Sequence, residues 1–141
     1  MSGAWTFGKA RTPVALRQGW HCMRCGINTH GACDQSTHHR QLRSHADPDI
    51  RDNPANLIRL CGSGTTGCHG WVHAHPHEAW RNGWIVPASR DPLATPVRDW
   101  RGRWLILAPV DATSRPAAPE EARAFENDIN DLIKTKEGTL K

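Results

Sequence analysis

Four of the five cysteines stand in two pairs whose spacing suits a bound metal ion. Two residues separate Cys22 from Cys25, and a glycine-rich run of six separates Cys61 from Cys68. A tight turn lets the first two thiolates reach one ion at about 2.3 Å, and a tetrahedral zinc site needs two more ligands. The flexible run between the second pair can bend both sulfurs onto that ion. We therefore expect Cys22, Cys25, Cys61 and Cys68 to bind a structural zinc ion, with buried or redox-active cysteines as the alternative.

No other metal-binding residue lies at ligand spacing from the fifth cysteine, Cys33. We therefore expect Cys33 to serve as a small apolar side chain that fills space. It could replace one of the four paired cysteines, as could His21 or His30 beside the first pair. The number of cysteines is odd, and residues 1–20 lack the apolar stretch of a secretory signal. Both features favour reduced thiols, which are available to bind metal, over a disulfide framework.

His69 and His73 stand four residues apart, which suits a second metal ion. If a helix begins near Cys68, both imidazoles project from one face toward a common ion. Zinc proteases space two histidines in this way, but they need a glutamate directly after the first, and here that residue is Gly70. The sequence therefore disfavours peptide hydrolysis. Taken alone, two histidines at this spacing are as often unrelated surface residues as they are a metal site.

A second pair of histidines, His38 and His39, is consecutive. Neighbouring residues of a strand point to opposite faces, so these two rings cannot bind one ion without distortion. One can bind metal while the other acts on a substrate. The long loop over residues 40–55 also holds His45 and Asp49, and either could compete as a ligand, although polar loop residues are more often only solvated.

Strands and a helix must position these side chains. Residues 57–60 form a short apolar run that predicts a second strand, introduced by Asn56, whose side chain can bond backbone across the loop. Pro76 should end the helix that carries the second histidine pair. Residues 96–107 alternate around a turn at 99–102, which predicts a hairpin.

The two ends of the chain differ in character. Residues 1–20 contain glycine, proline and basic side chains without a helical or strand period, so we expect a flexible basic arm with at most a short strand over 14–16. Residues 112–119 read as a linker. Beyond it, apolar side chains recur on one helical face, and Pro119 suits the first helical position. That face comprises Ala122, Phe125, Ile129, Leu132 and Ile133.

Length, composition and charge limit the class of protein. With 141 residues, 38% of them hydrophobic, and a mean hydropathy of -0.63, the chain predicts one small domain that needs a metal or a disulfide to stabilise its core. No stretch approaches the roughly 18 apolar residues of a membrane span. The first 110 residues hold 13 basic and 7 acidic side chains, and twelve of the thirteen are arginine. A polyanion such as nucleic acid is therefore a candidate partner, with a solvated basic surface as the alternative.

The order along the chain is two thiols, a strand with two histidines, a loop, an asparagine, a strand, two thiols and a helix with His-x3-His. In this order, the segment 22–86 resembles the HNH nuclease family, also called ββα-metal or His-Me finger, and specifically its zinc-braced branch. The runs 56–73 and 79–86 are similar to small HNH proteins of actinobacterial phages. The resemblance implies an α+β fold: a small ββα-metal (HNH) domain with a structural zinc knuckle, plus a hairpin and a C-terminal helix.

Three parts of the chain are expected accordingly. They are the flexible basic arm over residues 1–20, an HNH nuclease domain over 21–110 that includes the zinc site and the hairpin, and a linker with an amphipathic helix over 111–141. One feature departs from the family pattern. The second pair of thiols is normally closer, as C-x2-C, although the phage relatives share the longer loop.

For the site, the resemblance implies a role for each histidine of the two pairs. His38, His69 and His73 would bind one catalytic divalent cation, which could be Mg²⁺, Mn²⁺, Ni²⁺ or Zn²⁺. Imidazole ligands favour zinc or nickel over magnesium. His39 would be the general base that takes a proton from the attacking water, and Asn56 would pin the loop so that this ring presents the correct nitrogen. The reaction implied is hydrolysis of a DNA phosphodiester bond.

Arginines that border this site are candidates to bind the phosphates that flank the cut. We expect Arg40, Arg43 and Arg59 to bind DNA, and Arg51 also borders the site; ordinary surface arginine is the alternative for each. The resemblance implies a metal-dependent endonuclease of phage DNA processing or packaging in the cytoplasm of the bacterial host cell. Its partners would be DNA and terminase or portal proteins, and not a membrane. Two alternatives stay open: a non-catalytic, zinc-braced DNA-binding module, and a toxin-like nuclease neutralised by an acidic partner.

Overall fold

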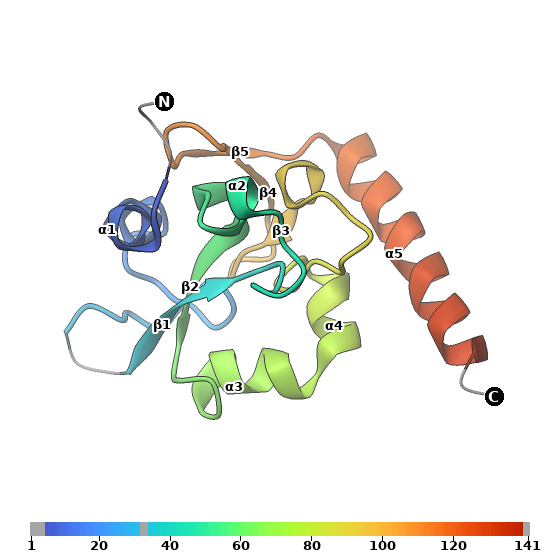
Figure 1. The fold of residues 1–141 in the computed structure, drawn as a ribbon, viewed down its shortest axis with the longest axis horizontal. Coiled ribbons are helices and arrows are strands. Elements are labelled where there is room, and N and C mark those ends of the chain that lie inside the picture. The colour runs from blue at the N-terminus through green and yellow to red at the C-terminus, as the bar shows by residue number, and fades with distance from the viewer. Residues whose placement is uncertain (1–4, 32–33, 140–141) are drawn as a thin grey trace.

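The chain forms helices interleaved with two small antiparallel sheets, as Figure 1 shows. The computed structural model describes residues 5–31 and 34–139. The elements in chain order are α1 (Phe7–Arg17), β1 (Gln35–His39), α2 (Pro48–Arg51), β2 (Leu57–Cys61), α3 (Gly67–Ala74), α4 (Pro76–Arg81), β3 (Val97–Arg98), β4 (Trp104–Leu107), β5 (Ser114–Pro116) and α5 (Pro119–Thr139). Short 3-10 turns precede β2 and β3. The predicted α+β class is confirmed.

The sheet of β1 and β2 carries the residues singled out from the sequence. The two strands pair antiparallel, with Gln35 opposite Cys61 and His39 opposite Leu57. Both strands are therefore formed where the histidine pair and the apolar run 57–60 predict them. The next helix, α3, packs against both strands. This arrangement brings ligand candidates from β1, from the end of β2 and from α3 into one region.

The helix predicted near Cys68 is α3, which begins at Gly67 and ends at Ala74. Pro76 stands in the first turn of α4, where its missing N–H leaves no helical bond unmade. The predicted end of the first helix before Pro76 is confirmed.

Within the segment 1–20, the described residues 5–20 are not the loose arm that the sequence leads us to expect. They hold α1 instead, and the residues 14–16 proposed as a short strand lie inside this helix. The helix begins with a side-chain cap, because the hydroxyl of Thr6 accepts a hydrogen bond from the backbone N–H of Lys9 at 3.2 Å.

Tertiary packing explains why α1 forms. Ala10 and Val14 are fully buried and pack with Leu57 of β2. Gly8 and Pro13 both disfavour a helix in an isolated segment, which is why the pattern indicates an arm. Burial of one face against β2 outweighs that local cost.

The second sheet has the strand order β3, β4, β5. Val97 lies opposite Leu105 in the hairpin of β3 and β4, so the predicted hairpin is confirmed. β5 pairs with the other edge of β4, although it lies within the segment 112–119 that we expect to be a linker. The three residues of β5 show no alternation of apolar and polar side chains that would predict a strand. β5 therefore depends on its pairing with the edge of β4.

The predicted amphipathic helix is confirmed as α5, which lies along one side of the domain beside α4 (Figure 1). Phe125, Ile129 and Ile133 are buried, with Trp80 and Trp104 packed against them. Across the described residues, neither α5 nor any other helix is both long enough and apolar enough for a membrane span.

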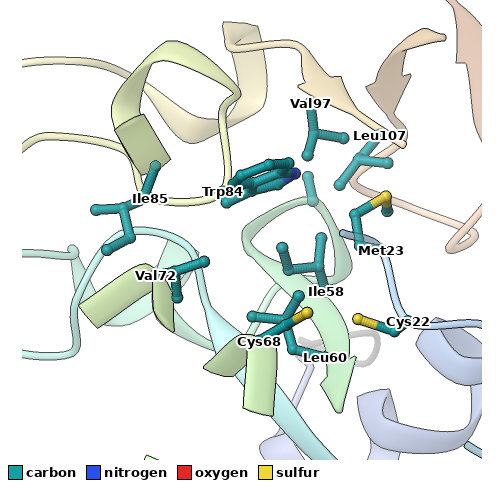
Figure 2. Close-up of a cluster of buried hydrophobic side chains, with 12 residues drawn as sticks. Cys22, Met23, Ile58, Leu60, Cys68, Val72, Trp84, Ile85, Val97 and Leu107 are labelled. Atoms are coloured by element: carbon teal, nitrogen blue, oxygen red, sulfur yellow. The ribbon is translucent and has the colours of Figure 1, made fainter. Parts of the chain in front are cut away.

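The main core lies between β2, α3 and the second sheet. Figure 2 shows Ile58 and Leu60 of β2 near Val72 of α3, with Val97 and Leu107 of the second sheet at the other end of the cluster. The core is small, as the composition predicts, and it fixes the spacing between the strands and the helix that carry the candidate ligands.

Candidate metal centres and active site

The four paired cysteines converge on one point, called here the thiol cluster. One sulfur from each of Cys22, Cys25, Cys61 and Cys68 lies within 4.8 Å of the others. The sulfurs of Cys25 and Cys61 are 3.8 Å apart. Thiolates bound to tetrahedral zinc at about 2.3 Å would themselves be about 3.8 Å apart. Figure 2 shows the side chains of Cys22 and Cys68 pointing toward each other at the edge of the core. The donor set and its spacing fit a structural zinc ion.

Tight turns in two loops bring these sulfurs together. In the first loop, the N–H of Cys22 donates to the carbonyl of Ile27 and the N–H of Gly26 donates to the carbonyl of Cys22, both at 2.9 Å. In the second loop, Gly62 and Gly67 have φ values of 86° and 60°, and a Cβ on either would collide with the loop backbone. Glycine at both positions lets the six-residue run close on itself.

Hydrogen-bond donors surround the sulfurs of this cluster. The sulfur of Cys68 accepts from Arg24 Nη1 at 3.3 Å, and the sulfur of Cys61 accepts from the N–H of Cys68 at 3.4 Å. A hydrogen bond with Cys68 lowers the pKa of Cys22 to about 4, and the same bond raises the pKa of Cys68. A divalent cation bound to both sulfurs would displace the proton of this hydrogen bond. The Arg24 guanidinium, stacked 3.7 Å over the Trp71 ring, offsets part of the negative charge.

Three imidazoles form a second group, called here the imidazole cluster. One ring nitrogen from each of His38, His69 and His73 lies within 4.8 Å of the others. β1 supplies His38, and α3 supplies the other two from one face, as their spacing predicts. Ring centroids are 4.9 to 5.3 Å apart. Within the described residues, no fourth histidine, cysteine or carboxylate joins this cluster.

Hydrogen bonds indicate which nitrogens can bind a cation. Nε2 of the buried His38 lies 2.9 Å from the carbonyl of Trp84, so this nitrogen carries the proton and Nδ1 has the free lone pair. Burial holds the pKa of His38 well below its ordinary value, with a smaller contribution from the neighbouring His69, so the ring is neutral. Nε2 of His69 lies 3.2 Å from Nε2 of His73. Two nitrogens on tetrahedral zinc would be about 3.3 Å apart, so the pair fits a shared divalent cation.

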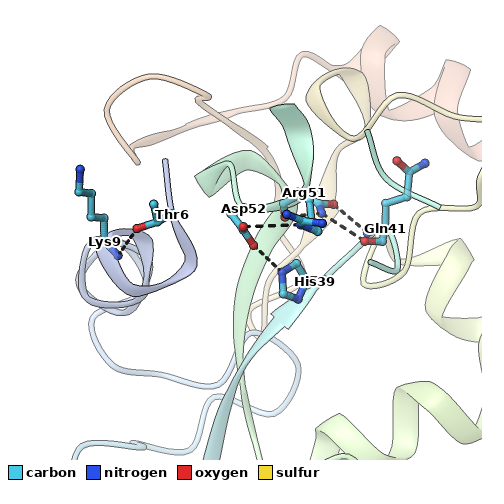
Figure 3. A network of polar contacts seen from close by, with 7 residues as sticks. Thr6, Lys9, His39, Gln41, Arg51 and Asp52 are labelled. Carbon is cyan, nitrogen blue, oxygen red and sulfur yellow. Dashed lines mark hydrogen bonds and ion pairs between the residues drawn. The ribbon is translucent and has the colours of Figure 1, made fainter. Parts of the chain in front are cut away.

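His39 turns away from the imidazole cluster toward α1 and the residue that follows α2. Its Nε2 lies 2.9 Å from Oδ1 of Asp52. The ring of Phe7 stacks on it with centroids 5.3 Å apart and an interplanar angle of 16°. Figure 3 shows His39 beside the end of β1 with its ring directed to Asp52. Among the described residues, no hydrogen bond reaches the other ring nitrogen, Nδ1.

Asn56 joins the two ends of the loop that separates β1 from β2. Its Oδ1 accepts from the N–H of Gln41 at 2.7 Å, and its Nδ2 donates to the carbonyls of Gln41 and Arg51 at 3.2 and 3.0 Å. The expectation that this side chain bonds backbone across the loop is confirmed. The bonds fix the backbone before α2, at Gln41, and at the last residue of α2, Arg51.

The structure corrects the role expected of Arg40. Its guanidinium is fully buried and donates five hydrogen bonds to backbone carbonyls, so it cannot reach DNA. The acceptors belong to Ala55, Gly83, Pro92, Thr95 and Pro96. Burial lowers the pKa of Arg40 to about 9, which leaves it charged at neutral pH.

The structure also corrects the DNA-binding role expected of Arg59, because this side chain is buried as well. Its Nε donates to the hydroxyl of Thr29, and its guanidinium lies 4.9 Å from the centre of the Trp20 ring. The expectation that both arginines bind DNA rests on their nearness in sequence to the histidines and Asn56, and distance along the sequence does not report burial. Arg43 is exposed, so its expected role stays a prediction.

The remaining ligand candidates lie outside both clusters. Nδ1 of His21 lies 2.8 Å from the carbonyl of Gly26, and the ring of His30 packs on that of Trp20. Neither histidine replaces a cysteine in the thiol cluster. His45 and Asp49 are exposed and join neither cluster. Cys33 lies outside the described residues.

Several side chains that support the clusters carry no signal in the sequence. The partners Asp52 and His39 are 13 positions apart, Arg24 and Cys68 are 44 apart, and the carbonyl that fixes His38 is 46 positions away. No ligand spacing or periodicity links residues so far apart, and only the folded chain brings them together.

Comparison with known proteins supplies no relative. The chain matches no family model, no curated protein and no solved structure. What the protein does must therefore be inferred from the two clusters and the side chains around them.

Proposed function

We propose that the protein is a metal-dependent endonuclease that hydrolyses DNA phosphodiester bonds, as the resemblance to HNH nucleases implies. The observation that carries the proposal is the convergence of His38, His69 and His73, with His39 next to the first of them on β1. A metal site with three protein ligands has positions left for water and substrate, which is typical of catalytic rather than structural sites. The thiol cluster serves stability, as a zinc brace between the first loop, β2 and α3.

The three imidazoles fit a catalytic cation without rearrangement. His38 is already neutral and is oriented by the carbonyl of Trp84, so it need not lose a proton to act as a ligand. The exposed His73 leaves the cluster open to solvent on the side of α3. A divalent cation bound there supplies positive charge to the scissile phosphate and the departing oxygen.

His39 is the general base in this proposal. Its Nε2 is engaged with Asp52, so Nδ1 is the nitrogen that accepts a proton from water. His38 and His39 are consecutive at the end of β1, so the ligand and the base share one end of the strand. Asn56 supports the base indirectly, because it fixes the backbone of Arg51 immediately before Asp52.

Two cations beside His39, the exposed Arg11 and the partly buried Arg51, replace the buried arginines as candidates to bind phosphate. The guanidinium of Arg11 lies 5.8 Å from the centre of the Phe7 ring, which stacks on His39. Nε of Arg51 lies 3.6 Å from Oδ2 of Asp52, which bonds His39. Each cation is therefore one side chain away from the base, where a DNA backbone would pass.

The proposal is tested by incubating supercoiled plasmid with the purified protein and Mg²⁺, Mn²⁺, Ni²⁺ or Zn²⁺ in turn. We expect nicked or linear DNA with at least one metal, and no cleavage by His39→Ala with an unchanged circular dichroism spectrum. His45→Ala is the matched control, since this exposed histidine joins neither cluster. DNA binding without cleavage under all four metals favours the zinc-braced binding module, and full activity in His39→Ala removes the assigned base.

A further inference from the structure

The ring of His39 is held from two directions by residues that neither the sequence nor the resemblance singles out. Asp52 bonds its Nε2 edge at 2.9 Å, and Phe7 covers one face in a nearly parallel stack. The side chains of His39 and Asp52 are 13% and 19% exposed, so water competes little for their bond. With Nε2 bonded to Asp52 and one face covered by Phe7, the imidazole of His39 has one free nitrogen, Nδ1, and the direction of that nitrogen is fixed.

Asp52 is not a free loop carboxylate. The residue before it is tied down, because the carbonyl of Arg51 accepts a hydrogen bond from Asn56 Nδ2 at 3.0 Å. Its second oxygen, Oδ2, faces Nε of Arg51 at 3.6 Å, and Figure 3 shows this chain of contacts. The carboxylate thus faces His39 with one oxygen and Arg51 with the other.

Phe7 is equally well fixed. It packs on the buried cluster formed by Ala10, Val14 and Leu57, which anchors α1 to β2. The helix that replaces the expected loose arm therefore forms one wall around His39. Rotation of the imidazole would break the Asp52 bond and the Phe7 stack together.

We propose that Asp52 is a positioning residue for His39. The inference rests on the proposed function. Asp52 accepts the Nε2–H of the neutral imidazole, which leaves the lone pair on Nδ1 aimed at the attacking water. When Nδ1 takes the water proton, both ring nitrogens carry protons and the ring is positive. The carboxylate stabilises that imidazolium and takes no proton itself, and the hydroxide formed from water bonds to phosphorus as the 3′ oxygen leaves.

Asp52→Ala tests the proposal, with Asp49→Ala as the matched control. Asp49 is an exposed carboxylate on α2, the short helix that Asp52 directly follows, so its loss removes the same charge without touching His39. The first readout is the ¹⁵N-coupled ring N–H signal of His39, assigned by its absence in His39→Ala. We expect a signal protected from exchange in the wild type and in Asp49→Ala, and its loss in Asp52→Ala.

The second readout is cleavage of a fluorescent DNA duplex. We expect kcat of Asp52→Ala to fall by about 10- to 100-fold with KM nearly unchanged, because the base is misaligned while DNA binding is intact. Phe7→Leu, which keeps an apolar side chain on α1, should lower kcat less and leave the ring N–H signal in place. An unchanged kcat in a folded Asp52→Ala, or a ring signal that survives that substitution, overturns the proposal.

The two readouts separate failure of this inference from failure of the proposed function. If the wild type cleaves no DNA with any of the four metals, the nuclease assignment fails, whatever the ring signal shows. If the wild type cleaves and His39→Ala does not, but Asp52→Ala matches the wild type, only the role of Asp52 is wrong.

Discussion

The thiol cluster and the imidazole cluster are neighbours, yet they differ in what they leave open. Cys68 and His69 are consecutive residues of α3, and one belongs to each cluster. The thiol cluster has four candidate ligands, and donors from Arg24 and from backbone reach the sulfurs of Cys68 and Cys61, while Cys25 is exposed. The imidazole cluster has three ligands, one of which is the exposed His73. One short helix therefore serves a closed ligand set and an open one.

The eight residues of α3 thus supply candidate ligands both for a structural ion and for the proposed catalytic ion. A closed four-ligand site returns its binding free energy to folding, because the unfolded chain holds no preformed site. An open site contributes less to folding, since positions on the ion are kept for water and phosphate. Removing one ligand should thus have opposite consequences in the two clusters.

The largest expected effect is loss of cleavage in His69→Ala. Substitutions in the outer shell of a metal site cost about 10- to 100-fold, so loss of a direct ligand should lower the cleavage rate by more than about 100-fold. The melting temperature should move by less than about 4 °C, the shift that 1 kcal/mol gives in a chain of this size. Plasmid cleavage and calorimetry, with His45→Ala as control, check both. An unfolded His69→Ala protein would break the comparison, because both clusters would then be structural.

The opposite result is expected for Cys61→Ser. Loss of one thiolate should release zinc and lower the free energy of unfolding by about 3 kcal/mol or more, a part of the roughly 10 kcal/mol that structural zinc contributes to small domains. The melting temperature should then fall by about 10 °C. The zinc-to-protein ratio from elemental analysis is the direct measurement, and Cys33→Ser is the matched control. A ratio equal to that of the wild type contradicts a zinc ion in the thiol cluster.

The sequence predicts parts of each cluster from local patterns. C-x2-C lies in the loop between α1 and β1, His-x3-His lies on α3 and the apolar run 57–60 lies on β2, so ligand spacing and periodicity place each of them. That His38 joins His69 and His73 is implied only by the resemblance to HNH nucleases. The α5 helix is also predicted from a local pattern, since its apolar face repeats over several turns.

What the sequence does not predict depends on contacts between distant segments. Gly8 and Pro13 obscure the helical pattern of α1 in the sequence. Packing against Leu57 of β2 stabilises this helix. Arg40 reads as a surface cation, yet its guanidinium joins carbonyls from residues 55 to 96. No local pattern distinguishes a buried arginine from an exposed one, and none pairs Asp52 with a histidine 13 positions away.

We expect Arg40→Lys to lower the stability less than Cys61→Ser does. The thiol cluster is proposed to be held by a zinc ion, whereas the end of β1 is held by the hydrogen bonds of Arg40. Lysine keeps the charge but loses the planar fork, and carbonyls left unsatisfied should lower the free energy of unfolding by about 1 to 3 kcal/mol.

Denaturant unfolding measures this change, with the exposed Arg123→Lys on α5 as control. The cleavage rate of each folded molecule should stay near that of the wild type. If Arg40→Lys is instead as stable as the wild type but binds DNA weakly, Arg40 reaches the substrate and its assignment as a buried brace is wrong.

The smallest expected effect is on the salt dependence of DNA affinity, and it shows which cluster faces DNA. Arg43 is exposed in the loop that follows β1, the strand that carries His38 of the imidazole cluster, whereas Arg101 is exposed at the β3–β4 turn, where Trp100 packs on His21, the residue before Cys22 of the thiol cluster. A cation that contacts one phosphate contributes about one unit to the slope of log affinity against log salt. We expect Arg43→Ala to reduce that slope by about 1 and Arg101→Ala to leave it unchanged, as measured by fluorescence anisotropy with a DNA duplex. The reverse outcome would place the DNA on the thiol side, away from the open ligand set, and would leave the three imidazoles without access to a phosphate.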